Sequence, residues 1–145
     1  MTIYHRPSKL TQLSNRVMSW FASMGLLPSR MLTLEVKGRR SGQVRATVVN
    51  TVEFEVQRYL VSPRGEAEWV RNVRAARGQA IIRHGKRKAV RLEEMPSGET
   101  AAIIKAYLKE NAMATKGHFG IAPDSPIEEF ERIAPRHPVF RITYA

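Results

Sequence analysis

The sequence predicts an α+β domain in which about six strands form an antiparallel or mixed barrel flanked by helices. Runs that alternate apolar and polar residues, or that are rich in β-branched residues, recur along the chain between turn signals. Consecutive runs are ordered as hairpins, with helical patterns inserted between them, instead of a repeated βαβ order. The length of 145 residues suits one compact domain with a sizeable core.

An amphipathic helix is the first expected element, at residues 10–25. Its apolar side chains recur at helical spacing, and Gly25 and Pro28 are stop signals. We therefore divide the chain into an N-terminal amphipathic helical segment at residues 1–30 and a barrel domain at residues 31–145. The favoured role of the helix is to cover the core.

Peripheral membrane contact is the alternative role for this helix, because basic residues flank an apolar face that carries Trp20 and Phe21. The apolar run at residues 17–27 is too short to cross a bilayer, and it lacks the order and cleavage site of a secretory signal. We therefore expect a cytoplasmic protein, with attachment to a membrane surface as the alternative.

The expected strands follow from alternation and β-branched content. The first hairpin joins an alternating run to a run rich in β-branched residues, with Gly38 and Gly42 near its loop. A second hairpin turns at residues 84–86, and the last strand alternates up to Tyr144. The strands are expected at residues 32–36, 44–52, 58–62, 79–83, 88–95 and 138–144.

The expected helices are marked by charged ends and by proline or glycine boundaries. In the first, Glu66 and Glu68 suit the first turn and Arg74 and Arg77 the last, since each complements the helix dipole, and Gly78 terminates the helix. The helices are expected at residues 66–77, 96–110 and 126–133, and a long loop at residues 111–125.

The charge balance points to an anionic partner. Twenty-four Lys and Arg residues against thirteen Asp and Glu residues give a formal net charge of +11. Nucleic acid, an acidic membrane face and a polyanionic small molecule all fit this charge. Nucleic acid ranks last and is not expected, because the arginines gather at turns and the few aromatic residues form no stacking platform.

Several classes of chemistry are excluded by what the sequence lacks. With no cysteine, disulfides, thiolate metal sites and a cysteine nucleophile are excluded. No Ser-His-Asp set, zinc motif, Walker loop or dinucleotide fingerprint is present, and the four histidines lack metal-ligand spacing. We therefore expect neither hydrolysis nor a bound metal.

The first candidate ligand site is the turn of the first hairpin, which carries Arg39, Arg40, Ser41 and Gly42, with Arg45 close behind. Guanidinium groups donate in pairs to phosphate or carboxylate, and a glycine-containing turn frees backbone N–H groups for an anion. A solvated hairpin tip with basic side chains is the alternative.

The second candidate lies where the third expected strand runs into a helix. Ser62, Arg64 and Gly65 place a hydroxyl, a cation and backbone N–H groups near the helix N-terminus. Trp69 and Asn72, three residues apart, share a face of that helix, so the indole could pack beneath a bound ring. The alternatives are that Trp69 belongs to the core and that Asn72 ties down a loop.

Histidines and aromatics supply the remaining candidates. His84 and His137 are expected at the surface, at a turn and at a strand entry. His118 and Phe119 fall in the long loop, where binding residues concentrate, and are candidates for the substrate side together with Tyr107.

Three segments carry a resemblance to a known family, namely residues 38–42 with Arg45, residues 62–65 and residues 69–73. In order and spacing they resemble the deazaflavin-dependent nitroreductase family of actinobacterial oxidoreductases, and the likeness covers residues 31–144. The resemblance implies a six-stranded split β-barrel that binds the deazaflavin coenzyme F-420.

The resemblance also implies residue roles. Arg39, Arg40, Ser41 and Arg45 match the loop that holds the phosphate and acidic tail of the cofactor in the family, and Ser62, Arg64 and Gly65 match its second loop. Two positions depart from the family pattern. Glu66 stands where a glycine is common, which puts a carboxylate beside the anion site, and Val48 stands where a proline is common.

The implied reaction is hydride transfer from reduced coenzyme F-420 to a small organic acceptor such as a quinone, nitroaromatic or enone, with Tyr107 or His118 as candidate catalytic residues. FMN on the same fold is the alternative cofactor. A non-catalytic cofactor- or lipid-binding module at the membrane surface is the alternative function. The expected assembly is a monomer or homodimer.

Overall fold

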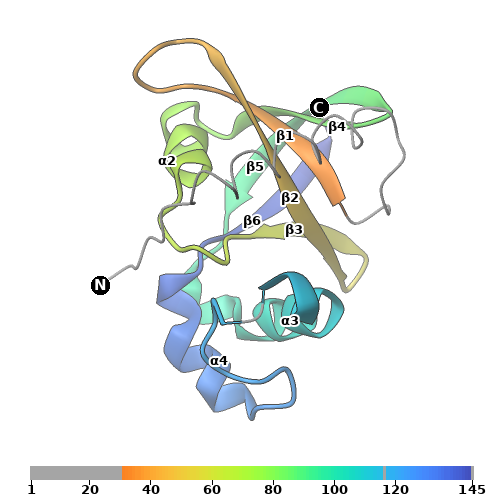
Figure 1. The fold of residues 1–145 in the computed structure, drawn as a ribbon, viewed down its shortest axis with the longest axis vertical. Coiled ribbons are helices and arrows are strands. Elements are labelled where there is room, and N and C mark those ends of the chain that lie inside the picture. Colours follow the sequence, from red (N-terminus) through yellow and green to blue (C-terminus); the bar gives the residue numbers. More distant parts are fainter. Residues whose placement is uncertain (1–30, 116, 145) are drawn as a thin grey trace.

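Six antiparallel strands close into a barrel in the order β1-β2-β3-β6-β5-β4 (Figure 1). The computed structural model describes residues 31–115 and 117–144, so the helix expected at residues 10–25 lies outside the described residues. The strands are β1 (Met31–Lys37), β2 (Val44–Phe54), β3 (Gln57–Val61), β4 (Gln79–His84), β5 (Lys86–Glu94) and β6 (Val139–Tyr144). All six expected strands are confirmed, with shifts of a few residues at their ends.

The hairpin order predicted from the sequence is also confirmed. Three pairs of consecutive strands form hairpins, namely β1–β2, β2–β3 and β4–β5. The barrel is then completed by three pairings between strands distant in sequence, β5 with β6, β1 with β4 and β3 with β6. Every pairing is antiparallel, which excludes a mixed barrel for the described strands.

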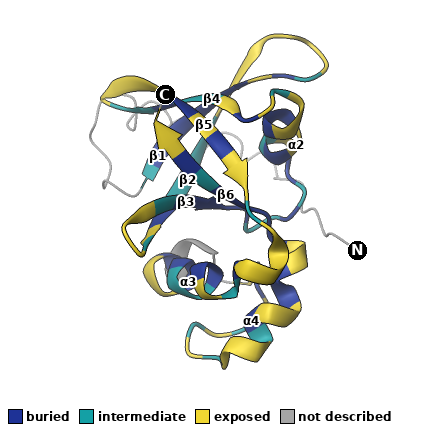
Figure 2. Ribbon diagram, turned by 180° about the vertical axis from the view of Figure 1, so that it is seen from behind, coloured by how far each residue is buried: buried dark blue, intermediate teal, exposed yellow. Residues whose placement is uncertain are grey.

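Alternation along the strands builds the barrel interior. In β1, Leu32, Leu34 and Val36 point into the core, since successive side chains point to opposite faces. Helix α2 (Glu68–Ala75) adds Val70 and Val73 to the same cluster. The barrel interior and the inner face of α2 therefore form one core, whereas the β1–β2 hairpin tip is exposed (Figure 2).

A second core lies between the barrel wall and two further helices, α3 (Ala101–Thr115) and α4 (Ile127–Ile133). Short 3-10 turns, η1 (Ser97–Glu99) and η2 (Ala134–Arg136), flank them. Strand β3 serves both cores, because Leu60 faces the barrel interior while Tyr59 and Val61 face this second cluster. Figure 1 shows α3 and α4 together below the barrel, away from α2.

The helix at residues 101–115 is longer than expected, so the prediction of a loop beginning at residue 111 is wrong. Asn111, taken as a loop residue from its type, lies inside the helix with a φ of −122°, and its amide donates to the Tyr107 carbonyl at 3.0 Å. Bonding of a side chain to the carbonyl four residues earlier is typical of a bent helix, and the helix is kinked at Asn111. None of the helices in the described part of the chain is long and apolar enough to span a membrane.

Candidate functional site

The β1–β2 loop has a fixed shape that its own backbone maintains. The Gly38 N–H donates to the Gln43 carbonyl at 2.7 Å, and the Gly42 N–H donates to the Gly38 carbonyl at 3.0 Å. Gly42 has a φ of +72°, which favours glycine. Ser41 Oγ accepts from the Gln43 N–H at 3.2 Å. The loop is therefore closed internally, and its tip presents Arg40 to solvent.

Helix α2 holds this loop through Asn72. The Asn72 side-chain oxygen accepts from both the backbone N–H of Arg39 at 3.1 Å and its Nη1 at 2.8 Å. Nη1 also donates to Glu68 at 2.7 Å. Asn72 is only 6% exposed. The alternative predicted for Asn72, that it ties down a loop, is thus confirmed by these bonds.

Glu68 is a member of this site that the sequence did not single out. The hydrogen bond from Arg39 is the main cause that lowers the pKa of the Glu68 carboxyl below its usual range, and the charges of Arg39, Arg40 and Arg71 act in the same direction. Glu68 lies four residues before Asn72, so both share one helix face. That spacing was visible in the sequence, but their common partner 29 and 33 residues away was not.

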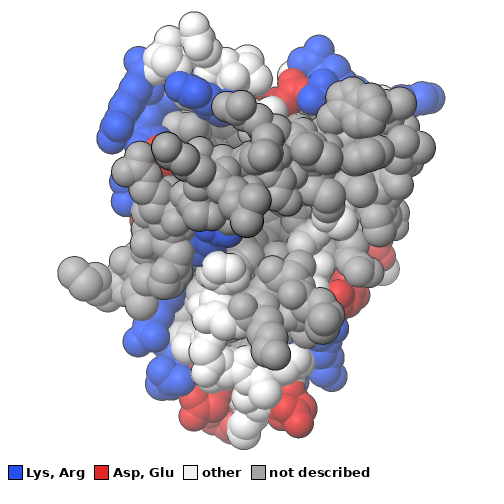
Figure 3. Space-filling model, viewed as in Figure 1, with Lys and Arg blue, Asp and Glu red and all other residues white. Residues whose placement is uncertain are grey.

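Positive charge is concentrated near this loop. Arg40, Arg45 and Lys37 are all exposed on the β1–β2 hairpin. In Figure 3, Lys and Arg side chains lie at the upper left and upper right of the molecule, the end that holds the β1–β2 and β4–β5 hairpins, and others lie along its lower flanks. Acidic side chains gather at the lower end, around α4, which carries Glu128, Glu129 and Glu131. The hairpin end therefore attracts anions.

The second predicted site, residues 62–65, is a turn that leads from β3 into α2. Ser62 is fully buried, and its hydroxyl donates to the Gly65 carbonyl at 2.6 Å. Gly65 has a φ of +75°, and its N–H approaches the Ser62 carbonyl at 3.4 Å. The Ser62 hydroxyl is therefore used to stabilise the turn. The positively charged side chain of the turn is that of Arg64, which is half-buried.

His137 is buried against this turn, which contradicts its expected place at the surface. The side chain is 5% exposed, and its Nδ1 lies 3.0 Å from the Ser62 carbonyl. A carbonyl only accepts, so Nδ1 carries the proton. The ring packs on Phe119 with 4.3 Å between centroids. The prediction failed because residues 134–136 form a 3-10 turn that folds the imidazole inward.

Trp69 lies half-buried on α2 and packs on Phe140, with ring centroids 5.6 Å apart. The indole therefore joins the edge of the barrel core, as its alternative interpretation predicted. Its partly exposed position still leaves it beside the α2 face that holds the β1–β2 loop through Asn72.

The three substrate-side candidates lie in or beside the second core. Tyr107 is 1% exposed and packs on Phe119 at 6.0 Å between centroids. Burial raises the pKa of the Tyr107 phenol, and a hydrogen bond with Asn50 opposes the shift. Phe119 is also buried, while His118 is half-buried beside it. Since the Tyr107 phenol is enclosed by the core, we assign it no proton transfer.

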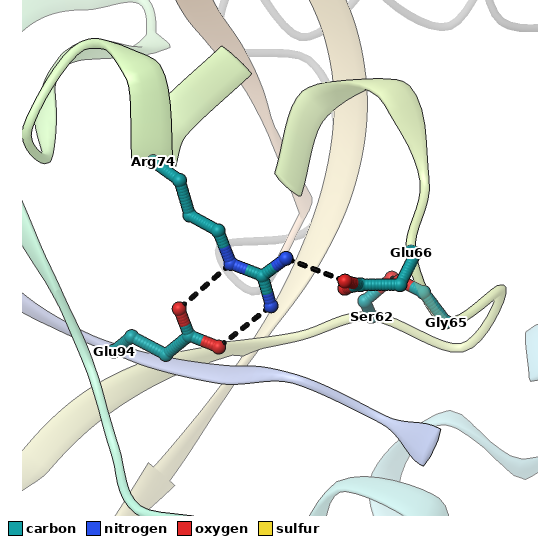
Figure 4. Close-up of polar contacts among 5 residues, drawn as sticks. All are labelled: Ser62, Gly65, Glu66, Arg74 and Glu94. Atoms are coloured by element: carbon teal, nitrogen blue, oxygen red, sulfur yellow. Dashed lines mark hydrogen bonds and ion pairs between the residues drawn. The ribbon is translucent and has the colours of Figure 1, made fainter. Parts of the chain in front are cut away.

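Glu66 does not point its carboxylate freely toward the second turn. It accepts from Arg74 Nη1 at 2.5 Å, and the other end of that guanidinium binds Glu94 (Figure 4). The negative charge of Glu66, which stands where a glycine is common in the family, is therefore balanced by the positive charge of Arg74 on α2.

The donors at the two turns fit a polyanionic ligand. Both turns meet at α2, because the β1–β2 loop is bonded to Asn72 while residues 62–65 lead directly into the helix. The charged donors beside them are guanidinium groups, which suit phosphate and carboxylate. Among the described residues, no group of three or more His, Cys, Asp or Glu side chains could hold a metal ion.

Removal of the Asn72 amide is expected to loosen the β1–β2 loop. In Asn72→Ala the buried acceptor for the Arg39 N–H disappears, so we expect unfolding to become about 1–2 kcal/mol easier. Hydrogen exchange at the Arg39 amide should accelerate more than exchange at the barrel strands. Asn72→Asp, which keeps the acceptor oxygen, is the control. Unchanged exchange at Arg39 in Asn72→Ala would contradict the anchoring role.

Comparisons with known proteins identify the family and the fold. The family model described as "F420H(2)-dependent quinone reductase" matches residues 15–116. A solved F420-H2 dependent reductase (FDR-A) is similar at 18% identity, with 81% of this chain and 96% of that chain covered and a TM-score of 0.51.

Two other solved structures share the fold. One, described as a domain-swapped dimer, covers 92% of this chain and 96% of its own at 16% identity, with a TM-score of 0.54. A FAD-binding protein from Mesorhizobium loti covers 87% and 88% at 15% identity, with a TM-score of 0.52. No curated protein matches. Because the family model spans most of the sequence, the chain belongs to the F420H(2)-dependent quinone reductase family, which confirms the resemblance drawn from its motifs.

Proposed function

We propose that this protein is an oxidoreductase that transfers a hydride from reduced coenzyme F-420 to a small organic acceptor. The observation that carries the proposal is the β1–β2 loop, which Asn72 holds against α2 with Arg39 bound and Arg40 and Arg45 exposed nearby. When bound, the reduced deazaflavin supplies the hydride. The protein supplies binding, orientation and exclusion of water.

In this proposal the hairpin end binds the charged part of the cofactor. Arg40 and Arg45 bind the phosphate and acidic tail, while Arg39, Ser41 and Gly42 set the shape of the loop. Arg64, with the backbone of the turn that Ser62 and Gly65 form, makes the second contact. Trp69 positions the ring system from α2. These assignments rest on charge complementarity and on the position of both turns beside one helix.

The acceptor is a quinone in the favoured form of this proposal, since the family is described by that reaction. Nitroaromatic and enone acceptors are the other classes. His118 and Phe119 are the proposed substrate side, because Phe119 packs on His137 and His137 binds the Ser62 carbonyl of the cofactor turn. This chain of contacts connects the second core to the proposed site.

An absorbance assay of reduced coenzyme F-420 tests the reaction. With a quinone present, we expect the purified protein to oxidise reduced coenzyme F-420 far faster than NADH or NADPH. Nitroaromatic and enone acceptors and a parallel titration with FMN complete the panel. Tight binding without turnover on any acceptor would favour a cofactor carrier, and tighter binding of FMN than of coenzyme F-420 would contradict the cofactor assignment.

We also propose that the protein is a homodimer in the cytoplasm. Support for the dimer comes from the similar structure described as a domain-swapped dimer. Light scattering on the purified protein measures its mass in solution, and a value of 16.5 kDa would identify a monomer. Sedimentation with acidic vesicles tests the alternative of membrane contact.

A further inference from the structure

Arg74 joins three segments of the fold through one guanidinium group. Its Nε and Nη2 donate to both carboxylate oxygens of Glu94, at 2.9 and 2.8 Å, and its Nη1 donates to Glu66 at 2.5 Å. Arg74 comes from α2, Glu94 from the end of β5, and Glu66 directly follows Gly65 of the turn. Figure 4 shows the guanidinium between the two carboxylates, with Ser62 and Gly65 beside Glu66.

The charge of this cluster depends on Arg74. Two carboxylates and one guanidinium leave a net charge of −1, and without Arg74 the cluster would carry −2. The Glu66 side chain is 23% exposed, and its second oxygen, Oε2, is buried with no hydrogen-bond partner among the described residues. The hydrogen bonds that Arg74 donates to Glu94 and, to a lesser extent, to Glu66 raise the pKa of its guanidinium, which keeps it charged.

The cluster also lines a cavity of about 490 Å³ between α2, the end of β5 and η2. Because open space lies on one side of it, packing alone does not hold the Glu66 side chain in place. The bond to Arg74 fixes its direction. If released, the Glu66 carboxylate could turn toward Arg64 and Gly65, which directly precede it in the chain. Ordinary buffer screens charges only beyond about 8–10 Å, so an anion bound at this turn would be repelled by the carboxylate.

We propose that Arg74 is a positioning residue for cofactor binding, which acts by holding and neutralising Glu66 so that this carboxylate does not repel the anionic tail of the cofactor. The inference rests on the proposed function, since it takes the turn at residues 62–65 as one of the anion contacts. Through Glu94, the same guanidinium also ties the turn to β5. Arg74 thus explains how this chain accommodates an acidic residue next to its anion site.

The test measures affinity for coenzyme F-420 from its fluorescence, with the purified full-length protein and no turnover. We expect Arg74→Gln to weaken binding about tenfold or more, because a half-buried carboxylate loses its partner. Adding Glu66→Gln to that variant should restore most of the affinity, since the repelling charge is gone. Glu66→Gln alone should bind as tightly as the unmodified protein or slightly more tightly.

A ligand without charge separates electrostatics from structure. The deazaflavin riboside, which lacks the phosphate and acidic tail, should bind Arg74→Gln and the unmodified protein about equally. Arg132→Gln is the matched control, because it removes one arginine from an exposed pair with Glu129 on α4 and changes the net charge equally. Its affinity should stay unchanged. Arg74→Lys, which keeps the charge, serves as the milder variant if Arg74→Gln does not fold.

The outcomes distinguish the inference from the proposed function. If the unmodified protein does not bind coenzyme F-420, the proposed function fails. If it binds and Arg74→Gln binds equally well, the positioning role is wrong. A loss that Glu66→Gln does not rescue, or an equal loss for the riboside, would show that Arg74 acts only through the structure of the turn and would overturn the electrostatic role.

Discussion

Gly78→Ala is expected to be among the most destabilising single substitutions in this protein. Gly78 joins α2 to β4 with a φ of +81°, and an added Cβ would lie 2.4 Å from the Leu92 carbonyl oxygen. The backbone there cannot move away easily, because the Leu92 N–H donates to the Gly78 carbonyl at 2.8 Å and the Gly78 N–H to Val73 at 2.9 Å. The positive φ and the overpacking together should lower the free energy of unfolding by about 3 kcal/mol or more.

Two further glycines separate these causes. Gly120 has a φ of +72° but open space around its Cβ position, so Gly120→Ala should show only the conformational cost of about 1–2 kcal/mol. Gly98 has neither a positive φ nor a neighbour within 4 Å, so Gly98→Ala should be neutral. Urea unfolding followed by circular dichroism gives the three values. An equal cost for Gly78→Ala and Gly120→Ala would mean that the contact with Leu92 relaxes freely.

Removing the two exposed arginines of the β1–β2 hairpin should have the largest effect on cofactor affinity. Within residues 31–115 and 117–144, neither Arg40 nor Arg45 makes side-chain bonds like those of Arg39 with Asn72 and Glu68. If each makes a charge-assisted bond to the cofactor tail, Arg40→Ala/Arg45→Ala should weaken binding of coenzyme F-420 by about 100-fold or more. Fluorescence titration measures the change.

Salt dependence and a charge-matched control test the reason for this effect. Added salt should weaken binding to the unmodified protein, and the double variant should depend less on salt because fewer ionic contacts remain. Arg91→Ala/Arg132→Ala removes the same charge from β5 and α4, where both side chains are exposed. It should bind nearly as tightly as the unmodified protein. An equal loss in both double variants would indicate general attraction by net charge instead of a site at the hairpin.

Most of the barrel could be predicted from the sequence because strand signals are local. Leu32, Leu34 and Val36 alternate with polar residues, and this period of two identified β1 and its inner face. Glycines near residues 38–42 and at residue 85 then placed the turns of the β1–β2 and β4–β5 hairpins, whereas the β2–β3 turn at residues 55–56 contains no glycine. The pairs of β5 with β6, β1 with β4 and β3 with β6 join strands separated by helices, so they had to come from the whole fold.

For the candidate site, the motifs could be predicted from the sequence, but the contacts between them could not. The motifs at residues 38–45 and 62–65 were recognised from their own composition, whereas the bonds that hold them were not. Arg39 meets Asn72 across 33 positions, and Arg74 meets Glu94 across 20. His137 was expected at the surface because its neighbours are Arg136 and Pro138, yet it supports Ser62 across 75 positions.

The sequence by itself determined the strands, their hairpin order, the basic turns and the family, because each of these depends on spacing within a short segment. Only the tertiary structure decided that Asn72 and Glu68 hold Arg39, that Arg74 holds Glu66, and that Tyr107 is enclosed in the second core. The physical reason is that hydrogen bonds and ion pairs act over a few ångströms. Which side chains come that close depends on how the barrel closes and on how α2 and α3 pack against it.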